Sequence, residues 1–269
     1  MPSQIVDDYF RTNSLPHIWC PGCGNGIVTR SIVKAIDNLK LDRDKICIVS
    51  GIGCSSRASG YLDFNTLHTT HGRALAFATG IKMANPNLDV IVITGDGDSA
   101  AIGGNHLIHA ARRNIDITTI VYNNNIYGMT GGQYSPTTPR GDKGTTAPYG
   151  NIDTQFDLCD LTTSAGATYV GRSTVFNPKL IVKLIEEGIK NKGFSFIETM
   201  TICPTYYGRK NKKGNAVDMM KFLRDQSINI NAAKKLDEDK LKGKIIVGEL
   251  HKSIRPEYTE EYKRLVNSF

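Results

Sequence analysis

The chain has 269 residues, of which 40 % are hydrophobic and 22 % are charged, and its formal net charge is +7. This composition is typical of a soluble globular protein that can bury a substantial core. No apolar run approaches the roughly 18 residues of a membrane-spanning helix, and segment 1–13 carries acids where a secretory signal would be apolar. We therefore expect a cytoplasmic protein with no membrane partner.

Strand-like and helix-like patterns alternate along residues 28–201. Runs rich in β-branched residues, typical of strands, occupy residues 45–51, 88–95, 115–123, 167–172 and 194–201. Helix-like patterns lie between them, at residues 28–39, 71–84, 100–113 and 177–193. The last of these begins with Asn177-Pro178 and ends with Gly193, as a helix should. Continuous apolar strands between helices predict an α/β fold, with a mostly parallel sheet and helices on both faces.

Two segments depart from this alternation. Residues 128–150 are crowded with Gly, Pro and Thr, and a loop of that length in a compact domain is usually functional or disordered. Residues 204–269 are polar and weakly patterned. We expect residues 1–205 to form the α/β domain, and residues 206–269 to form an irregular C-terminal arm packed on a partner subunit.

Polar clusters follow two of the predicted strands. Gly95-Asp96-Gly97-Asp98 ends the strand at 88–95, and Asn123-Asn124-Asn125 ends the strand at 115–123. The carboxyl ends of parallel strands are where open α/β sheets bind ligands. Glycines allow close approach to a phosphate, and carboxylate and amide oxygens are ligands that Mg²⁺ prefers. Simple turns are the alternative interpretation, but the paired spacing favours a diphosphate and metal site.

Six cysteines include one CxxC pair, Cys20 and Cys23. A disulfide, a zinc ion, an iron–sulfur cluster and a redox dithiol are all possible for that pair alone, although a reducing cytosol disfavours disulfides. A [4Fe–4S] cluster takes four thiolates, which the pair and two distant single cysteines would supply. A zinc ribbon would more often show two CxxC pairs, but the residues alone leave zinc and iron–sulfur level. Cys47 and Cys159 lie in apolar contexts and are interpreted as core residues.

The GDG sequence, followed some 25 residues later by NN, resembles the motif shared by many thiamine diphosphate enzymes. The resemblance implies that Mg²⁺ is bound by Asp96, Asn124 and the backbone carbonyl of Ile126. It also implies that the diphosphate lies on the backbone of residues near both clusters, namely Gly97, Asp98, Gly128 and Met129.

Five stretches occur in one order: WCPGCGNG, SGIGCSSR, HTTHGRALAFATGIK, the thiamine diphosphate motif and CPTYYGR. Over residues 15–210 the chain resembles the β subunit of the 2-oxoacid:ferredoxin oxidoreductases. That family holds one [4Fe–4S] cluster with four cysteines, which correspond to Cys20, Cys23, Cys54 and Cys203. It also places a cofactor-contacting histidine at His71, beside the backbone of Ile52, Gly53, Cys54 and Ser55. A histidine that merely starts a helix is the alternative for His71.

The resemblance implies a coenzyme A-dependent oxidative decarboxylation of a 2-oxoacid, with electrons passing through the cluster to ferredoxin. Arg57 corresponds to the basic residue that meets the distal carboxylate in relatives that accept 2-oxoglutarate, so 2-oxoglutarate is the preferred substrate hypothesis. Branched-chain 2-oxoacids and pyruvate are the alternative substrates. The family activates its cofactor with a glutamate from a second domain, so we expect a heterodimer in which an α subunit completes the site.

Two other functions compete. A non-redox thiamine diphosphate lyase or synthase would leave the four cysteines without a role. A zinc-stabilised nucleic-acid-binding module would explain the charge but not the two polar clusters, and no nucleic-acid recognition motif is present, so we expect no nucleic-acid partner. The basic run 208–215 is interpreted as solvated surface, or else as a site near Lys210, Lys212 and Lys213 that docks an α subunit or an acidic ferredoxin.

Overall fold

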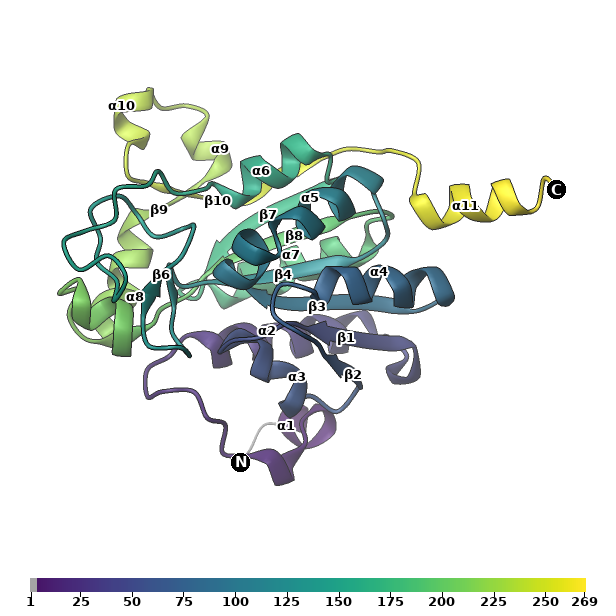
Figure 1. Ribbon diagram of the computed structural model, residues 1–269, viewed down its shortest axis with the longest axis horizontal. Coiled ribbons are helices and arrows are strands. Elements are labelled where there is room, and N and C mark those ends of the chain that lie inside the picture. The colour runs from purple at the N-terminus through teal and green to yellow at the C-terminus, as the bar shows by residue number, and fades with distance from the viewer. Residues whose placement is uncertain (1–3) are drawn as a thin grey trace.

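The computed structural model describes residues 4–269. Its centre is an eight-stranded sheet in the order β2-β1-β3-β4-β8-β7-β10-β9 (Figure 1). The pairs from β2 through to β7 are parallel, and only β10 runs antiparallel to its neighbour β7 within the described sheet. The strands are β1 (Ile46–Ser50), β2 (Asn65–His68), β3 (Asp89–Gly95), β4 (Thr118–Asn123), β7 (Tyr169–Thr174), β8 (Ser195–Met200), β9 (Ser227–Asn229) and β10 (Ile245–Lys252).

Helices cover both faces of the sheet, and alternate strand residues divide the core between them. Ile46 and Ile48 of β1 join a cluster with α2 (Asn25–Leu39) and α7 (Pro178–Lys190). Cys47 and Val49 face the opposite cluster, formed with α4 (Ala74–Ala84), α5 (Gly104–Arg113) and α6 (Leu158–Ala165). The predicted α/β architecture, with a mostly parallel sheet between two helical layers, is confirmed.

The helix predicted near residue 177 shows how the sequence sets its boundary. The Asn177 side chain accepts a hydrogen bond from the Leu180 backbone N–H, and Pro178 occupies the first turn. A side-chain cap satisfies a backbone donor that the helix itself leaves unpaired, and proline loses no hydrogen bond there. α7 then packs against α2 over the sheet.

The C-terminal segment contains more regular structure than predicted. Strands β9 and β10 extend the central sheet, and the segment also forms α8 (Ala216–Gln226), α9 (Ile230–Ala233), α10 (Glu238–Leu241) and α11 (Tyr258–Val266). α11 stands away from the main body (Figure 1). β10 was not predicted because it lacks the continuous apolar run of a buried strand. It lies next to the outermost strand β9, is half exposed, and has a register shift between Glu249 and His251. Whether residues 206–269 pack on a partner stays a prediction, as does a domain boundary at residue 205.

The Gly/Pro/Thr-rich segment 128–150 is an ordered loop next to the carboxyl ends of β3 and β4. It contains the turn and the second strand of a two-stranded hairpin formed by β5 (Ile126–Tyr127) and β6 (Gln133–Tyr134). Thr138 donates a hydrogen bond to the carbonyl of Asn125 at 2.6 Å, and Asn151 donates to the carbonyl of Thr138 at 2.8 Å. These contacts fasten the segment over the sheet edge on which the predicted site lies.

The remaining N-terminal elements are short. They are the α-helices α1 (Gln4–Tyr9) and α3 (Ala58–Tyr61) and the 3₁₀ helices η1 (Thr12–Ser14), η2 (Arg43–Lys45) and η3 (Ser55–Arg57). No helix within residues 4–269 is both long and apolar enough to cross a membrane.

Candidate functional site

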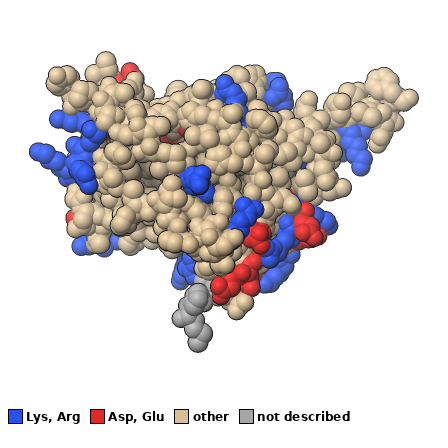
Figure 2. Space-filling model, turned by 60° about the horizontal axis from the view of Figure 1, so that its bottom comes forward, with Lys and Arg blue, Asp and Glu red and all other residues tan. Residues whose placement is uncertain are grey.

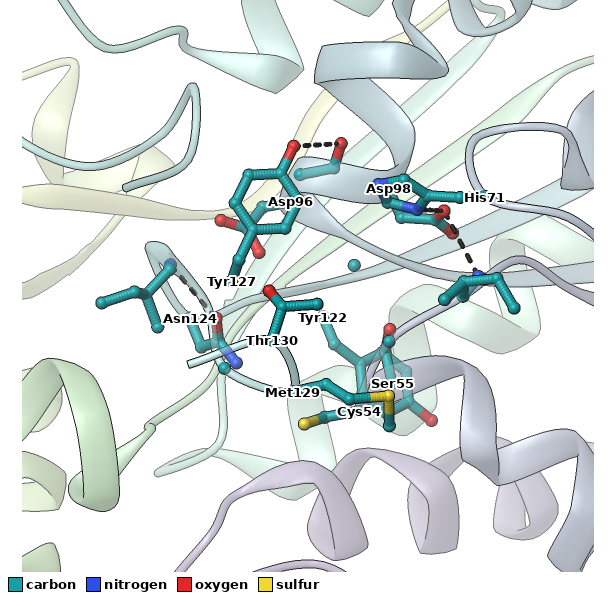
Figure 3. Close-up of a pocket in the computed structure, with 16 residues that line it drawn as sticks. Cys54, Ser55, His71, Asp96, Asp98, Tyr122, Asn124, Tyr127, Met129 and Thr130 are labelled. Carbon is teal, nitrogen blue, oxygen red and sulfur yellow. Dashed lines mark hydrogen bonds and ion pairs between the residues drawn. The ribbon is translucent and has the colours of Figure 1, made fainter. Parts of the chain in front are cut away.

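A cavity of about 100 Å³ lies at the carboxyl ends of β1, β3 and β4 (Figure 3). The loops that follow these three strands form its walls together with His71, which lies in the segment after β2. We call it the acidic cavity after its two aspartates. Its lining includes every residue predicted to contact thiamine diphosphate or its metal: Ile52, Gly53, Cys54, Ser55, His71, Asp96, Gly97, Asp98, Asn124, Ile126, Gly128 and Met129. Segments that are far apart in the sequence therefore meet at one sheet edge.

Asp96 is buried at the end of β3, with 3 % of its surface exposed. Its carboxylate accepts hydrogen bonds from Ser135 Oγ at 2.5 Å and Thr137 Oγ1 at 2.7 Å. Burial raises the pKa of Asp96 to about 6, although the two hydroxyl donors act in the opposite direction. Because these donors are neutral, a cation bound here would supply the charge that favours the carboxylate.

The three consecutive asparagines after β4 have different roles. Asn123 turns away from the cavity and donates to Glu198 Oε1 at 2.7 Å. Asn124 lines the cavity, and its side-chain oxygen accepts a hydrogen bond from the Ile126 backbone N–H at 3.2 Å. Asn125 has a φ of 60°, a left-handed conformation that asparagine tolerates better than most residues. The turn thus presents one amide to the cavity and buries another in the sheet.

His71 is held by Asp98 (Figure 3). The His71 Nδ1 and Asp98 Oδ1 atoms lie 2.6 Å apart, and Asp98 also accepts hydrogen bonds from the Gly72 N–H and Thr94 Oγ1, each at 2.7 Å. The Asp98 carboxylate is therefore engaged within the protein, and its backbone is the part available to a diphosphate. With Nδ1 directed at Asp98, the Nε2 atom of His71 is left to meet a ligand.

Tyr127 was not singled out by sequence. Its hydroxyl donates to the Gly97 carbonyl at 3.1 Å, and its ring lies edge-on to His71 with centroids 6.0 Å apart. A side chain at position 97 would overlap the Tyr127 ring, so the second glycine of GDG is required by packing as well as by ligand approach. Ser135 and Thr137 were not singled out either, although the segment that contains them was predicted to be either functional or disordered.

A second cavity, of about 230 Å³, is lined by four cysteines: Cys20, Cys23, Cys54 and Cys203. We call it the thiol cavity. All four cysteines are free. Burial, reinforced by repulsion among the neighbouring thiols, raises the pKa of Cys23 to about 12 and that of Cys54 to about 11. A positively charged centre would be needed to hold these groups as thiolates at neutral pH.

Backbone contacts bring the cysteines together from three parts of the chain. Cys20 and Cys23 form one turn, with the Cys23 N–H donating to the Cys20 carbonyl at 3.0 Å. The Gly24 N–H donates to the Ile202 carbonyl at 3.3 Å, which places this turn beside the residue before Cys203. Trp19 Nε1 donates to the Cys54 carbonyl at 2.6 Å. The N-terminal segment thus connects the loop after β1 with the end of β8.

The two cavities adjoin. Cys54, Asn124, Gly128 and Met129 line both of them. A Cβ atom at position 128 would lie 3.6 Å from the Sγ atoms of both Cys54 and Cys203. A ligand in one cavity would therefore lie directly against the wall of the other.

Cys47 and Cys159 lie outside both cavity linings and are buried, which confirms their interpretation as core residues. The Cys159 sulfur comes close to carboxylates of Asp157 and Glu198, a combination that can bind metals elsewhere. Arg172 already forms ion pairs with both carboxylates, each at 2.5 Å. A cation there would compete with the guanidinium group, so this cluster is structural.

Arg57 ends the short 3₁₀ helix η3 (Ser55–Arg57) and is exposed. The family resemblance implies that Arg57 meets the distal carboxylate of the substrate, but Arg57 is absent from the described linings of both cavities. Burial and, as the second cause, the positive charge of Arg57 lower the pKa of His68. Arg57 thus lies beside the loop that carries Cys54 and faces outward.

Comparisons with known proteins agree with this arrangement. Residues 51–199 match the family model described as "Thiamine pyrophosphate enzyme, C-terminal TPP binding domain". That range spans β3, β4 and every described residue that lines the acidic cavity.

Curated relatives are more specific. The 2-oxoglutarate synthase subunit KorB of Methanocaldococcus jannaschii is 57 % identical over 96 % of both chains. The 2-oxoacid:ferredoxin oxidoreductase subunit beta of Saccharolobus solfataricus is 46 % identical over 70 % of this chain and 62 % of the relative.

A solved structure shares the whole fold. It is a 2-oxoglutarate:ferredoxin oxidoreductase from Magnetococcus marinus with 2-oxoglutarate, coenzyme A and succinyl-CoA bound. Its TM-score with this chain is 0.88 at 34 % identity, and the match covers 100 % of this chain and 91 % of the other.

Proposed function

The chain belongs to the β subunits of the 2-oxoacid:ferredoxin oxidoreductases, and on that premise we propose that its two cavities hold thiamine diphosphate with Mg²⁺ and a [4Fe–4S] cluster. Family membership confirms the resemblance found in the sequence and identifies the chain as an enzyme subunit. The single observation that carries the proposal is the shared wall between a cavity with diphosphate and metal donors and a cavity with four thiols.

The acidic cavity fits the cofactor and its metal. Mg²⁺ prefers oxygen ligands, which Asp96, Asn124 and the Ile126 carbonyl would supply. The backbone at Gly97 and Asp98, where a helical segment begins, would receive the diphosphate. When bound, thiamine diphosphate supplies the nucleophile and electron sink for cleavage next to a 2-oxo group. In the protein, Asp98 fixes the His71 ring so that its Nε2 can hydrogen-bond the cofactor or substrate.

The thiol cavity fits an iron–sulfur cluster better than a zinc ion. Zinc bound by four thiolates needs all four sulfurs about 2.3 Å from one ion, which brings the sulfurs close together. Within residues 4–269, no three of these cysteines bring their sulfurs within 4.8 Å of one another. They surround a space of about 230 Å³ instead. Four thiolates around a larger centre are the ligand set of a [4Fe–4S] cluster.

The proposed substrate is 2-oxoglutarate, which the enzyme would convert to succinyl-CoA with coenzyme A. The electrons would leave through the cluster to ferredoxin. This proposal is supported by the names of the relatives and of the solved structure. A non-redox lyase is not favoured, since it would leave the thiol cavity without a role. To test the substrate, the complex with its α subunit should be assayed with 2-oxoglutarate, pyruvate and branched-chain 2-oxoacids. A preference for pyruvate would overturn it.

Arg57 is proposed to select the dicarboxylic substrate, because a guanidinium fork suits a carboxylate. Its outward position makes this role depend on the surface that the α subunit covers. We expect Arg57→Ala to lower kcat/KM for 2-oxoglutarate relative to pyruvate by about tenfold or more, in line with the loss of about 1.5–3 kcal/mol from a charged hydrogen bond. An unchanged ratio of the two kcat/KM values would show that Arg57 does not determine substrate specificity.

The chain is proposed to be incomplete without the α subunit. Among the described residues that line the acidic cavity there is no glutamate to activate the cofactor. Purified alone, the chain should bind iron and thiamine diphosphate but show no 2-oxoacid-dependent reduction of a viologen dye. Robust 2-oxoacid-dependent dye reduction by the isolated chain would contradict this proposal.

A further inference from the structure

We propose that a basic surface beside the thiol cavity docks an acidic iron–sulfur electron carrier, and this rests on the proposed function of that cavity. The basic surface consists of two segments with five exposed cationic side chains: Arg140, Lys143, Arg209, Lys210 and Lys212. The proposal identifies where on this chain electrons leave the protein.

The surface begins one helical turn from the sulfurs. Cys203 is followed by the helical segment η5 (Pro204–Gly208), whose first residues, Pro204 to Tyr206, line the thiol cavity. Arg209 follows directly. A partner held by these cations would therefore lie against the wall that contains Cys203.

Reciprocal hydrogen bonds join the two segments. The Lys143 backbone N–H donates to Asn211 Oδ1 at 2.7 Å, and Asn211 Nδ2 donates to the Lys143 carbonyl at 3.1 Å. The 128–150 loop and the residues after η5 thus present one continuous face. Because both bonds involve backbone atoms of Lys143, its side chain stays free to meet a partner.

The positive charge on this face is left uncompensated. The nearby acid Asp142 is engaged internally, since it accepts a hydrogen bond from Tyr207 and pairs with Lys213 at 3.5 Å. Lys213 is therefore committed within the protein and is not counted in the surface. In the described part of the chain, no acid lies within ion-pair distance of the five cations. Figure 2 shows blue side chains gathered at the left end, where Figure 1 places α8, α10 and the 128–150 segment.

Apolar side chains at the cavity mouth complete the surface. Ile18 and Met129 line the thiol cavity and are 60 % and 43 % exposed. Apolar contacts flanked by charges are typical of protein interfaces, and complementary charge steers the encounter of two proteins. The position beside the thiols favours an acidic electron carrier over other anionic partners.

The test uses the complex with its α subunit and compares an acidic ferredoxin with a small viologen dye as electron acceptor. Lys210→Gln/Lys212→Gln should raise the KM for ferredoxin about tenfold at low ionic strength and leave dye reduction unchanged. The difference from the wild type should shrink towards 1 M salt, where the Debye length falls to about 3 Å. Lys179→Gln/Lys183→Gln on α7 is the matched control, with the same charge change away from the cavity.

Each other outcome has a distinct meaning. An equal ferredoxin KM in the two double variants would overturn the docking surface while leaving the proposed function intact. A raised KM for coenzyme A with an unchanged ferredoxin KM would also overturn it, because the cations would then serve a substrate. Failure of the wild-type complex to reduce the dye with any 2-oxoacid would overturn the proposed function itself, and the docking proposal with it.

Discussion

The acidic cavity and the thiol cavity share a wall but are built in opposite ways. The acidic cavity is formed by loops after adjacent strands, and Asp96 and Asp98 are held by hydrogen bonds from the protein itself. The thiol cavity collects four cysteines from three distant segments, and burial, followed by repulsion from the neighbouring thiols, raises the pKa of Cys23 and Cys54 and so disfavours their thiolate forms. The first site is organised before a ligand arrives, whereas the second needs its ligand to balance the charge of its donors.

The largest expected effect is the loss of the cluster. Cys20→Ser removes one of four thiolates, so iron content should fall from about four atoms per chain to near zero, and dye reduction by the complex should be lost. Thiamine diphosphate affinity should change little, because Cys20 does not line the acidic cavity. Iron content and cofactor affinity measured on one sample check both statements.

Cys47→Ala is the matched control, since that cysteine lies in the core on β1 and away from both linings. It should retain its iron. Equal iron loss in both variants would show that the loss reflects general instability rather than removal of a ligand.

The second-largest expected effect is the converse of the first: cofactor binding is weakened while iron is retained. Asp96→Asn removes the charged metal ligand but keeps an oxygen that Ser135 and Thr137 can still reach, so the fold should persist. Magnesium-dependent binding of thiamine diphosphate should weaken by more than about 100-fold, because Mg²⁺ depends on carboxylate ligands. Iron content should stay at the wild-type level. Calorimetric titration checks the affinity, with Asp153→Asn as a control on an exposed acid.

A smaller effect is expected from the hydroxyls that orient Asp96. Thr137 Oγ1 lies 2.7 Å from Asp96 and 2.9 Å from Asn123 Oδ1, so it connects the metal ligand to the polar network of the sheet. Thr137→Val should weaken Mg²⁺ binding about tenfold, the lower end for partners of metal ligands. Thr146→Val, in the same loop but exposed, should bind Mg²⁺ as the wild type does. Matching affinities for the two variants would show that the preorganisation of Asp96 contributes nothing to metal binding.

The contrast between the cavities also explains what the sequence could predict. Asp96 and Asn124 follow strand ends, so a local pattern places them at one sheet edge. Tyr127, Ser135 and Thr137 could not be found in that way, because their contacts depend on how residues 128–150 fold back over the edge.

The sequence predicted the thiol cavity and the outer strands of the sheet less completely, for two different reasons. The residues alone did not distinguish a zinc site from an iron–sulfur site. The family resemblance selected the four cysteines, and the fold brings these four together. Exposed β2 and the antiparallel β10 were missed because neither has the continuous apolar run of a buried strand. Lys213 belongs to the basic run that was predicted as a docking site. Unlike Lys210 and Lys212, it pairs with Asp142 and lies over the rings of Tyr207 and Phe222.

The smallest expected effect tests the wall itself. Gly128 borders both cavities, and a methyl group at that position would lie 3.6 Å from two of the sulfurs, an ordinary van der Waals distance. Gly128→Ala should therefore keep the fold and its iron, but it should narrow the space beside the diphosphate. We expect thiamine diphosphate affinity to fall by less than about fivefold, which corresponds to about 1 kcal/mol. If iron were lost instead, the thiols would have to move when the cluster binds, and the two cavities would be coupled through residue 128 rather than merely adjacent.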